Sequence, residues 1–418
     1  MKKKDGCGLS RRSFIKMSSG AIMAVSANWF MPRMSRAAED EIRLGAVCEL
    51  SGAGSTVSSE QAQGIEMAVE MYNQKGGILG KKIKLIMEDS ETKKDVGLAK
   101  TRKLVERDKI HFFTGITNSA ISMGIQPYLW EKKMLFVNSG SASDAVTEPP
   151  YCNRYFFKIT NSMKCFAMAV REPARRLGPK WYFIGDNYSF GKLCVGYAKQ
   201  AIALVKPNFE IVGEEYTNLG ETNYAPYITK VMAAKPDGLF LDNYGIGYTR
   251  IIKAAREMGV KAHIHHLFFS YVDAKATGDA VLGITGGTDI IHNNPNVPRF
   301  DQFLGEFQKK YNNYPFMPAT YSLTGVEALF EAVKAAGTLE TEAVIDKMET
   351  MTYPNSVMGK TFHFRKSDHV AISPVYTVEV IKDPKYQYTG KILEYDANPT
   401  AILAPEGQTG CEAAMKKG

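Results

Sequence analysis

The sequence predicts an α/β fold built from two doubly wound parallel sheets. From Ile42 onward, short apolar runs alternate with amphipathic stretches, which is typical of strand–helix–strand units around parallel sheets. About 380 residues follow the N-terminal segment, and a chain of that length with ordinary apolar content is long enough for two domains. We therefore expect two lobes, each with its own buried sheet.

Apolar runs of strand length mark the expected sheets. Such runs, bounded by turn residues, are typical of parallel strands that are buried on both faces. The expected strands are Ile42 to Cys48, Ile83 to Glu88, Ile110 to Thr114, Leu135 to Asn138, Trp181 to Gly185, Phe209 to Glu214, Gly238 to Leu241 and Ile284 to Thr288. Between them, apolar residues recur at helical spacing before Gly76 and before Gly259, and we interpret these stripes as core-facing sides of helices.

The chain begins with the features of a removable export leader. Ser10 to Lys16 read S-R-R-S-F-I-K, and a moderately apolar run from Met17 to Met31 follows, as in twin-arginine signal peptides. That run is shorter than the roughly 20 apolar residues that span a bilayer. Small residues near Ala37 predict cleavage there, so residues 1–38 would be removed and the mature protein would act in the periplasm.

The positive charge of the chain belongs to this leader. Residues 1–38 carry eight Lys or Arg and one Asp, so their removal lowers the formal charge from +8 to about +1. Nothing in the remaining charge favours nucleic acid or an anionic membrane surface as a partner. Cysteines remain at positions 48, 152, 165, 194 and 411. An oxidising compartment allows one or two disulfides, but an odd number at irregular spacing fixes no pairing.

The early strands run into small, polar loops. The segments Ser51 to Ser55, Thr117 to Ser119 and Asn138 to Ser143 follow three expected strands. Ligands of open parallel sheets bind outside such strand ends, and Asn118 or Ser119 is a good N-cap for the helix that follows. A capped helix start beside a Ser/Gly loop suits a carboxylate or carbonyl ligand. Ordinary strand-to-helix turns have the same composition, so the pattern alone leaves both interpretations open.

Motifs of enzymes and metal sites are missing. Gly76 to Lys82 resembles a P-loop but has one spacer too few, and Arg250 stands where a dinucleotide fingerprint after Gly245 needs its third glycine. We expect neither an enzyme nor a cofactor. His263, His265 and His266 could hold a metal, line a ligand pocket or form a plain strand edge. Without a third donor in the pattern, we expect no metal site.

Several motifs in fixed order carry a family resemblance. The segments are I-R-L-G-A-V-C-E-L-S-G at 42–52, N-Q-K-G-G-I-L-G-K-K-I at 73–83, T-G-I-T-N-S at 114–119 and N-S-G-S-A at 138–142. Together they closely resemble the first lobe of the leucine/isoleucine/valine-binding proteins, which are type I periplasmic solute-binding proteins of ATP-driven importers. A weaker resemblance continues to about residue 381.

The resemblance implies a two-lobed receptor that closes over its ligand. Three hinge crossings would join lobe 1, residues 41–158 plus 292–372, to lobe 2, residues 159–291 plus 373–395. Residues 396–418 would form an extended C-terminal tail. The ligand would lie between the lobes and would drive their closure by contacting both.

The resemblance also implies which residues bind the ligand. In lobe 1, Ser119 beside Asn118 would hydrogen-bond a carboxylate, and Gly140 and Ala142, with Ser141 between them, would contribute main-chain groups. In lobe 2, an aromatic side chain would cover the ligand and the loop after residue 241 would form a wall. The aromatic residue is Phe190, and the wall contains Asp242 and Tyr244. Tyr188 and Phe268 are further aromatic residues of the second lobe that we expect at the ligand.

One departure from the family bears on the ligand. Near Leu267 to Ser270, where the family has the carboxylate that pairs with a substrate ammonium, this chain has aromatic residues. An unpaired ammonium in a closed site costs several kcal/mol, although Asp186 or Asp242 could substitute. An aromatic or otherwise apolar carboxylate is therefore favoured, and a branched-chain-type amino acid or an amide or urea-like solute remains an alternative.

The function that follows is transport without turnover. The resemblance implies a monomeric receptor that delivers a small solute to an inner-membrane ABC permease. A ligand-sensing protein that docks on a chemoreceptor or a histidine kinase is the alternative, since the same closed lobes could serve it.

Overall fold

The computed structural model describes residues 41–418 apart from positions 53, 244, 293–297, 355, 359–360 and 417–418. The predicted leader and Tyr244 therefore lie outside the described residues. No helix in the described part of the chain is long and apolar enough to cross a membrane.

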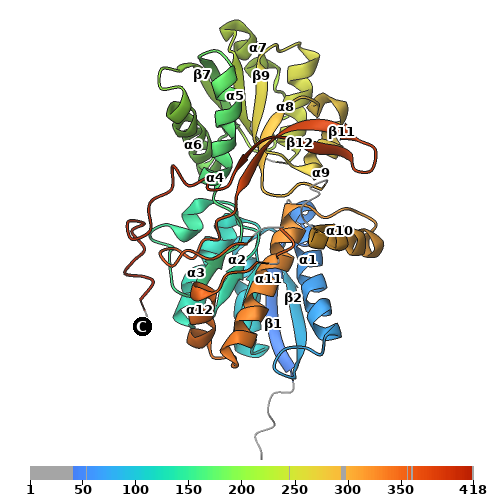
Figure 1. Cartoon of the computed structure of the whole chain (residues 1–418), viewed down its shortest axis with the longest axis vertical. Coiled ribbons are helices and arrows are strands. Elements are labelled where there is room, and N and C mark those ends of the chain that lie inside the picture. Colours follow the sequence, from blue (N-terminus) through green and yellow to red (C-terminus); the bar gives the residue numbers. More distant parts are fainter. Residues whose placement is uncertain are drawn as a thin grey trace, which may run out of the picture. The chain divides into compact units, whose positions relative to one another are not determined.

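The first sheet contains five parallel strands in the order β2-β1-β3-β4-β5, of which β1 and β2 are labelled side by side in Figure 1. Their bounds are β1 Glu41–Cys48, β2 Lys82–Asp89, β3 Phe112–Gly115, β4 Phe136–Asn138 and β5 Phe156–Lys158. The helices of this lobe are α1 Ser55–Gln74, α2 Lys94–Arg102, α3 Ser119–Glu131, α10 Pro298–Tyr311, α11 Met317–Ala336 and α12 Thr341–Thr350, with the π-helical turn η1 Lys103–Arg107 and the 3-10 turn η2 Asp144–Thr147. The central strands β3 and β4 and the second half of β1 are buried at every position, as expected for a parallel sheet with helices on both faces.

The second sheet has the order β12-β11-β10-β9-β8-β6-β7. Its strands are β6 Lys180–Asp186, β7 Glu210–Thr217, β8 Gly238–Asp242, β9 His263–Phe268, β10 Thr285–Thr288, β11 Val375–Asp383 and β12 Gln387–Asp396. The strands β6 to β10 are parallel, whereas β11 and β12 add an antiparallel hairpin at the edge. The helices are α4 Met163–Ala167, α5 Arg171–Arg176, α6 Ser189–Val205, α7 Ala225–Ala234, α8 Ile246–Glu257 and α9 Tyr271–Thr277, with the 3-10 turns η3 Met168–Val170 and η4 Gly278–Val281. The predicted fold, two parallel-sheet α/β lobes, is confirmed.

Buried hydrogen bonds join the segments that pass between the lobes. The Asn161 side chain, on the segment after β5, donates from Nδ2 to the Ser373 carbonyl, which precedes β11, over 2.8 Å. The Tyr321 hydroxyl of α11 donates to Asp289 Oδ2, on the segment after β10, over 2.7 Å. These groups are buried, so the segment after β5 is hydrogen-bonded to the segment before β11, and the segment after β10 is hydrogen-bonded to α11.

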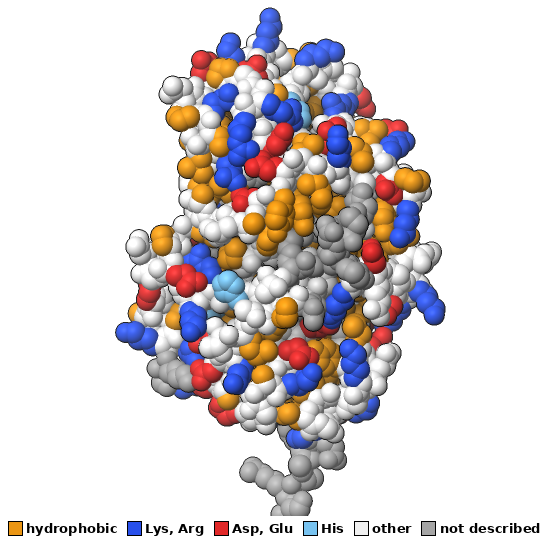
Figure 2. Space-filling model, in the orientation of Figure 1, with side chains coloured by type: hydrophobic (Ala, Val, Ile, Leu, Met, Phe, Trp, Pro, Cys, Tyr) orange, Lys and Arg blue, Asp and Glu red, His pale blue; other side chains and the backbone are white. Residues whose placement is uncertain are grey.

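The tail adds a covalent contact that the cysteine spacing could not predict. Cys411 forms a disulfide with Cys152, while Cys48, Cys165 and Cys194 are free and buried. The described part of the tail contains turns but no helix or strand. It ends beside α12, as Figure 1 shows. On the face drawn in Figure 2, basic and acidic side chains of the described residues are intermixed, which agrees with the nearly neutral charge expected after removal of the leader.

Candidate ligand-binding site

A buried carboxylate joins the loops that follow β1 and β3. Glu49 accepts hydrogen bonds from the Thr117 N–H at 3.1 Å, the Thr117 hydroxyl at 2.7 Å and the Asn118 N–H at 3.0 Å. Its own N–H donates to the Ser58 hydroxyl of α1 over 2.8 Å. Glu49 therefore fixes the start of α3 and already uses the N–H groups of residues 117 and 118.

Asn118 caps α3, as the sequence predicted for Asn118 or Ser119. Its Oδ1 accepts from the N–H groups of Ala120 at 2.9 Å and Ile121 at 3.2 Å. Because Asn118 provides the cap, the Ser119 hydroxyl is not needed for it. That hydroxyl instead accepts a hydrogen bond from the Ser143 N–H at 3.3 Å. Ser119 is half-buried and thus links the loop after β3 to the loop after β4. Its contact with a ligand stays a prediction.

Asn138 organises the loop after β4. Its Oδ1 accepts from the N–H groups of Ser141 at 2.9 Å and Gly140 at 3.4 Å, and its Nδ2 donates to the Ser141 hydroxyl over 3.1 Å. Ser141 is fully buried, and its hydroxyl donates to the Ile116 carbonyl over 3.2 Å. The hydroxyl of Ser141 thus serves the loop itself, and the ligand contacts expected of Gly140 and Ser141 stay predictions.

A fully buried lysine, which the sequence reasoning missed, supports the same loop. Lys158 ends β5 with no exposed surface, and its Nζ donates to the Ala142 carbonyl over 3.1 Å and to Asp144 Oδ1 over 3.2 Å. The Thr160 hydroxyl donates to the Ser141 carbonyl over 2.9 Å. The main-chain carbonyl groups of residues 141 and 142 are therefore held in place by these hydrogen bonds. The available signal was a lysine directly after an aromatic pair, F-F-K, in a run too short to be predicted as a strand.

Three predicted site residues meet at one apolar cluster of the second lobe. Ala142 from the first lobe, Phe190 from α6 and Phe268 from β9 are partly buried and pack against this cluster. Tyr188 stacks on Phe190 with ring centroids 5.9 Å apart, and Phe166 lies 6.3 Å from Phe268. The aromatic side chains predicted to cover a ligand thus border the same apolar cluster as Ala142 of the first-lobe loop, and their contact with a ligand stays a prediction.

The acidic residues at the ends of β6 and β8 face the protein rather than an open site. Asp186 accepts from the Thr217 hydroxyl at 3.1 Å and from Asn243 Nδ2 at 2.9 Å. Asp242 is buried beside Cys194, and its Oδ2 has no hydrogen-bond partner among the described residues. Burial, and then the charge of Asp186, raise the pKa of Asp242 well above its usual range. A carboxyl group with a raised pKa is a weaker partner for a substrate ammonium than an ordinary aspartate is.

The histidines belong to strand β9 and its end. His263 and His265 both lie within hydrogen-bond distance of the Thr285 hydroxyl, at 2.8 and 2.9 Å, and so share one face of the strand. The His266 ring lies 3.0 Å from the Phe268 carbonyl, and burial lowers its pKa to about 4. Within the described residues, no group of three or more His, Cys, Asp or Glu is placed to hold a metal ion.

A pocket of about 260 Å³ lies between α1 of the first lobe and α9 of the second. Glu60 lines it with 7% of its surface exposed and accepts from the Phe316 N–H at 3.2 Å. Burial raises the pKa of Glu60 to about 7 and that of Asp273, in the first turn of α9, to about 6. The sequence reasoning did not name these carboxylates. The complete lining is Ser59, Glu60, Gln63, Tyr271, Val272, Lys275 and Asn313.

Comparison with known proteins identifies the family. Residues 41–385 match the family model described as periplasmic binding protein. The chain belongs to the type I periplasmic binding proteins, in their leucine/isoleucine/valine-binding family. Among its relatives, this periplasmic binding protein is 26% identical to "Leu/Ile/Val-binding protein homolog 2" of Brucella abortus over 370 residues, which covers 84% of this chain and 94% of the relative. The predicted family is thus confirmed.

Solved structures show the same fold. The amino acid ABC transporter substrate-binding protein of Pseudomonas fluorescens Pf-5 superposes with a TM-score of 0.80 at 21% identity, covering 89% of this periplasmic binding protein and 98% of that chain. A solute-binding protein of an ABC transporter from Rhodopseudomonas palustris BisB5, in complex with 3,4-dihydroxybenzoic acid, has a TM-score of 0.75 at 19% identity, covering 86% and 98%.

Proposed function

We propose that this periplasmic binding protein binds an aromatic or apolar carboxylate without an ammonium group and delivers it to an inner-membrane ABC permease. The observation that carries the proposal is the presence on the second lobe of partly buried Phe190 and Phe268 together with a buried Asp242, whose pKa is raised by burial. This surface favours an apolar group, and the buried Asp242, whose pKa is raised, is a poor partner for an ammonium. The Ser119 hydroxyl would hydrogen-bond the carboxylate.

The magnitudes favour an apolar ligand. Covering an aromatic ring of about 150 Å² at about 25 cal/mol per Å² contributes roughly 4 kcal/mol. An ammonium that is desolvated without an ionised partner costs several kcal/mol, which would cancel that gain. We therefore expect micromolar binding, about 8 kcal/mol, for a suitable carboxylate and much weaker binding for the matching amino acid.

A branched-chain-type amino acid is the second candidate, and the pocket between α1 and α9 supports it. Glu60 lines that pocket and Asp273 lies in the adjoining first turn of α9, so either could receive an ammonium once ionised. Lys275 also lines the pocket and would compete for the same carboxylates. Because Lys275 opposes a cation there, we place this candidate second.

A thermal-shift panel on residues 39–418 tests the proposed ligand class. The panel contains benzoate, 3,4-dihydroxybenzoate, 3-phenylpropionate, 4-methylpentanoate, phenylalanine, leucine and benzamide. We expect stabilisation by a narrow group of the carboxylates, because a ligand that binds only the folded state raises the melting temperature. Benzamide is the matched neutral control. Stabilisation by the amino acids alone would overturn the proposed class, and no response to any compound would argue against a solute receptor of this kind.

We also propose that residues 1–38 export the protein to the periplasm, and that the lobes comprise 41–158 plus 292–372 and 159–291 plus 373–395. Replacing Arg11 and Arg12 by lysine should trap the precursor in the cytoplasm, because twin-arginine export reads that pair. Cell fractionation checks this, and normal export of the double variant would exclude the twin-arginine route.

A further inference from the structure

The chain after β12 runs from the second lobe back to the first. We call residues 397–416 the strap. Ile402 and Leu403 of the strap pack against the apolar cluster of the second lobe that also contacts Ala142. Further along, Cys411 is covalently bonded to Cys152, which follows η2 in the first lobe. The strap is therefore a fourth connection between the lobes, in addition to the three hinge crossings.

The first-lobe end of the strap is anchored at several points besides the disulfide. Arg365 Nη2 donates to the Ala404 carbonyl over 2.9 Å, and the Thr409 hydroxyl donates to the Ser367 carbonyl over 3.2 Å. Arg154, which is buried and paired with three acidic residues of α12, donates to the Met415 carbonyl over 3.2 Å. Residues 404–415 are thus held to the first lobe.

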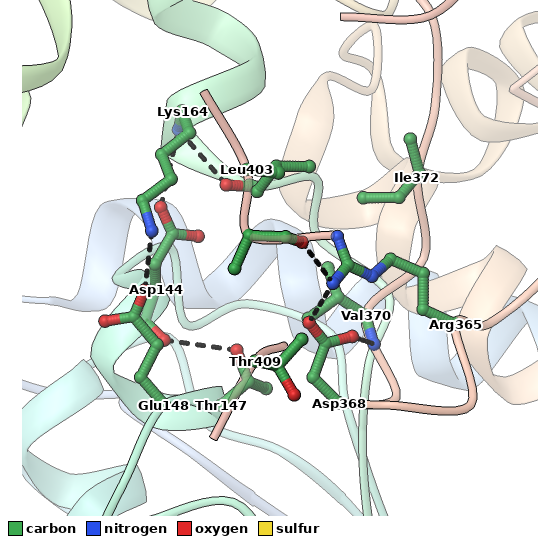
Figure 3. A pocket seen from close by; sticks show the side chains of 12 residues that line it. Asp144, Thr147, Glu148, Lys164, Arg365, Asp368, Val370, Ile372, Leu403 and Thr409 are labelled. Atoms are coloured by element: carbon green, nitrogen blue, oxygen red, sulfur yellow. Dashed lines mark hydrogen bonds and ion pairs between the residues drawn. The ribbon is translucent and has the colours of Figure 1, made fainter. Parts of the chain in front are cut away.

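A small charged cavity of about 40 Å³ lies where the strap covers two hinge crossings. Figure 3 shows its lining, which comes from η2, the start of α4, the third crossing and the strap. Lys164 pairs with Glu148 at 2.7 Å on one side, and Arg365 pairs with Asp368 at 3.0 Å on the other. The cavity has room for about one or two waters. The strap therefore closes over the hinge itself rather than over a distant surface.

The strap has almost no spare length at the point where it passes from the second lobe to the first. Leu403 packs on the second lobe and the next residue, Ala404, is bonded to Arg365 of the first lobe. Neighbouring Cα atoms are about 3.8 Å apart, so the lobes cannot separate here by more than a few ångströms without breaking one of these contacts. The disulfide prevents the strap from leaving the first lobe after such a break, which favours its return.

We propose that the strap is a disulfide-locked restraint that limits how far the two lobes open in the ligand-free protein. This restraint does not depend on which solute is bound. It predicts that freeing either end of the strap widens the range of distances between the lobes. The end on the second lobe is freed by Leu403→Asn, and the end on the first lobe by Cys152→Ser with Cys411→Ser.

Pulsed electron paramagnetic resonance, which measures the distance between two spin labels, tests the restraint in the ligand-free protein. Spin-labelled unnatural amino acids replace Glu131 in the first lobe and Leu204 in the second, both of which are exposed, so the native cysteines remain untouched. We expect the distance distribution to broaden toward longer distances in both strap variants. Leu219→Ala, at a second-lobe side chain that is 58% exposed, is the matched control and should leave the distribution unchanged.

An unchanged distribution in folded Leu403→Asn protein would overturn the proposal, whatever happens to its melting temperature. Circular dichroism confirms that each variant is folded. If the double serine variant does not fold, Leu403→Asn still decides the question, because it keeps the disulfide and every first-lobe anchor. A broadening that Leu219→Ala reproduces would also count against a specific restraint.

Discussion

Lys158→Met removes the ammonium that supports the loop after β4. The lysine has no exposed surface, and its partner Asp144 is also buried. Removing one member of a buried ion pair leaves an uncompensated charge and typically costs about 3 to 5 kcal/mol. Asp144 keeps weaker hydrogen bonds from the N–H groups of residues 163 and 164, so we expect the lower end of that range. The substitution should also weaken ligand binding, because the Ala142 carbonyl loses its donor.

Urea denaturation measures the loss, followed by the fluorescence of Trp130, which lies on α3 of the same lobe. A Trp181→Phe background removes the tryptophan of the second lobe. Lys199→Met is the matched control, because Lys199 pairs with Glu214 in a partly exposed pair that should contribute less than about 1 kcal/mol. Adding Asp144→Asn to Lys158→Met should recover part of the loss. A loss below about 1 kcal/mol would refute the idea that Lys158 holds this loop.

Two further predictions concern the pH dependence and the packing of the loops. Glu60 has a raised pKa in the folded protein, about 7 against 4.5, so its contribution to stability is intact below pH 4.5 and is lost as the pH rises through 7. Glu60→Gln should therefore raise the free energy of unfolding by up to about 3 kcal/mol at pH 8 and by much less at pH 4.5. Denaturation curves that show the same gain at both pH values would contradict this prediction. Gly140→Ala would place a methyl group against Gln61 and 2.8 Å from the Thr117 side chain. We therefore expect denaturation curves to show a loss of about 1 to 3 kcal/mol in the free energy of unfolding, and calorimetry to show weaker ligand binding. Unchanged stability would mean that the loop can move to accept the methyl group.

Most of the fold could be predicted from the sequence because buried parallel strands are largely apolar runs. The strands β1 and β8 are buried at nearly every position and were predicted within one or two residues. The strand β5 was missed although the equally short β4 was predicted, because the two apolar residues of β5 are followed directly by the charged Lys158. The hairpin of β11 and β12 was missed because its edge strand is half-exposed and mixes polar with apolar residues.

Only those features of the candidate site that depend on neighbouring residues in the chain could be predicted. The cap at Asn118 is a contact with the next two or three residues, and such local contacts are readable. Glu49, Lys158 and the pair Cys152 and Cys411 act across the fold, and the disulfide joins residues 259 positions apart. The raised pKa of Asp242 comes from burial and then from the charge of Asp186, and no spacing in the chain displays either cause.

Isothermal titration calorimetry with a matched pair tests the central claim most directly. Residues 39–418 are titrated with 3-phenylpropionate and with phenylalanine, and then with 4-methylpentanoate and leucine; the members of each pair differ only by the α-ammonium group. The account predicts that at least one carboxylate binds and that its amino acid partner binds about 100-fold more weakly, which corresponds to about 2.7 kcal/mol. Tighter binding of leucine or phenylalanine than of its deaminated partner would contradict the account.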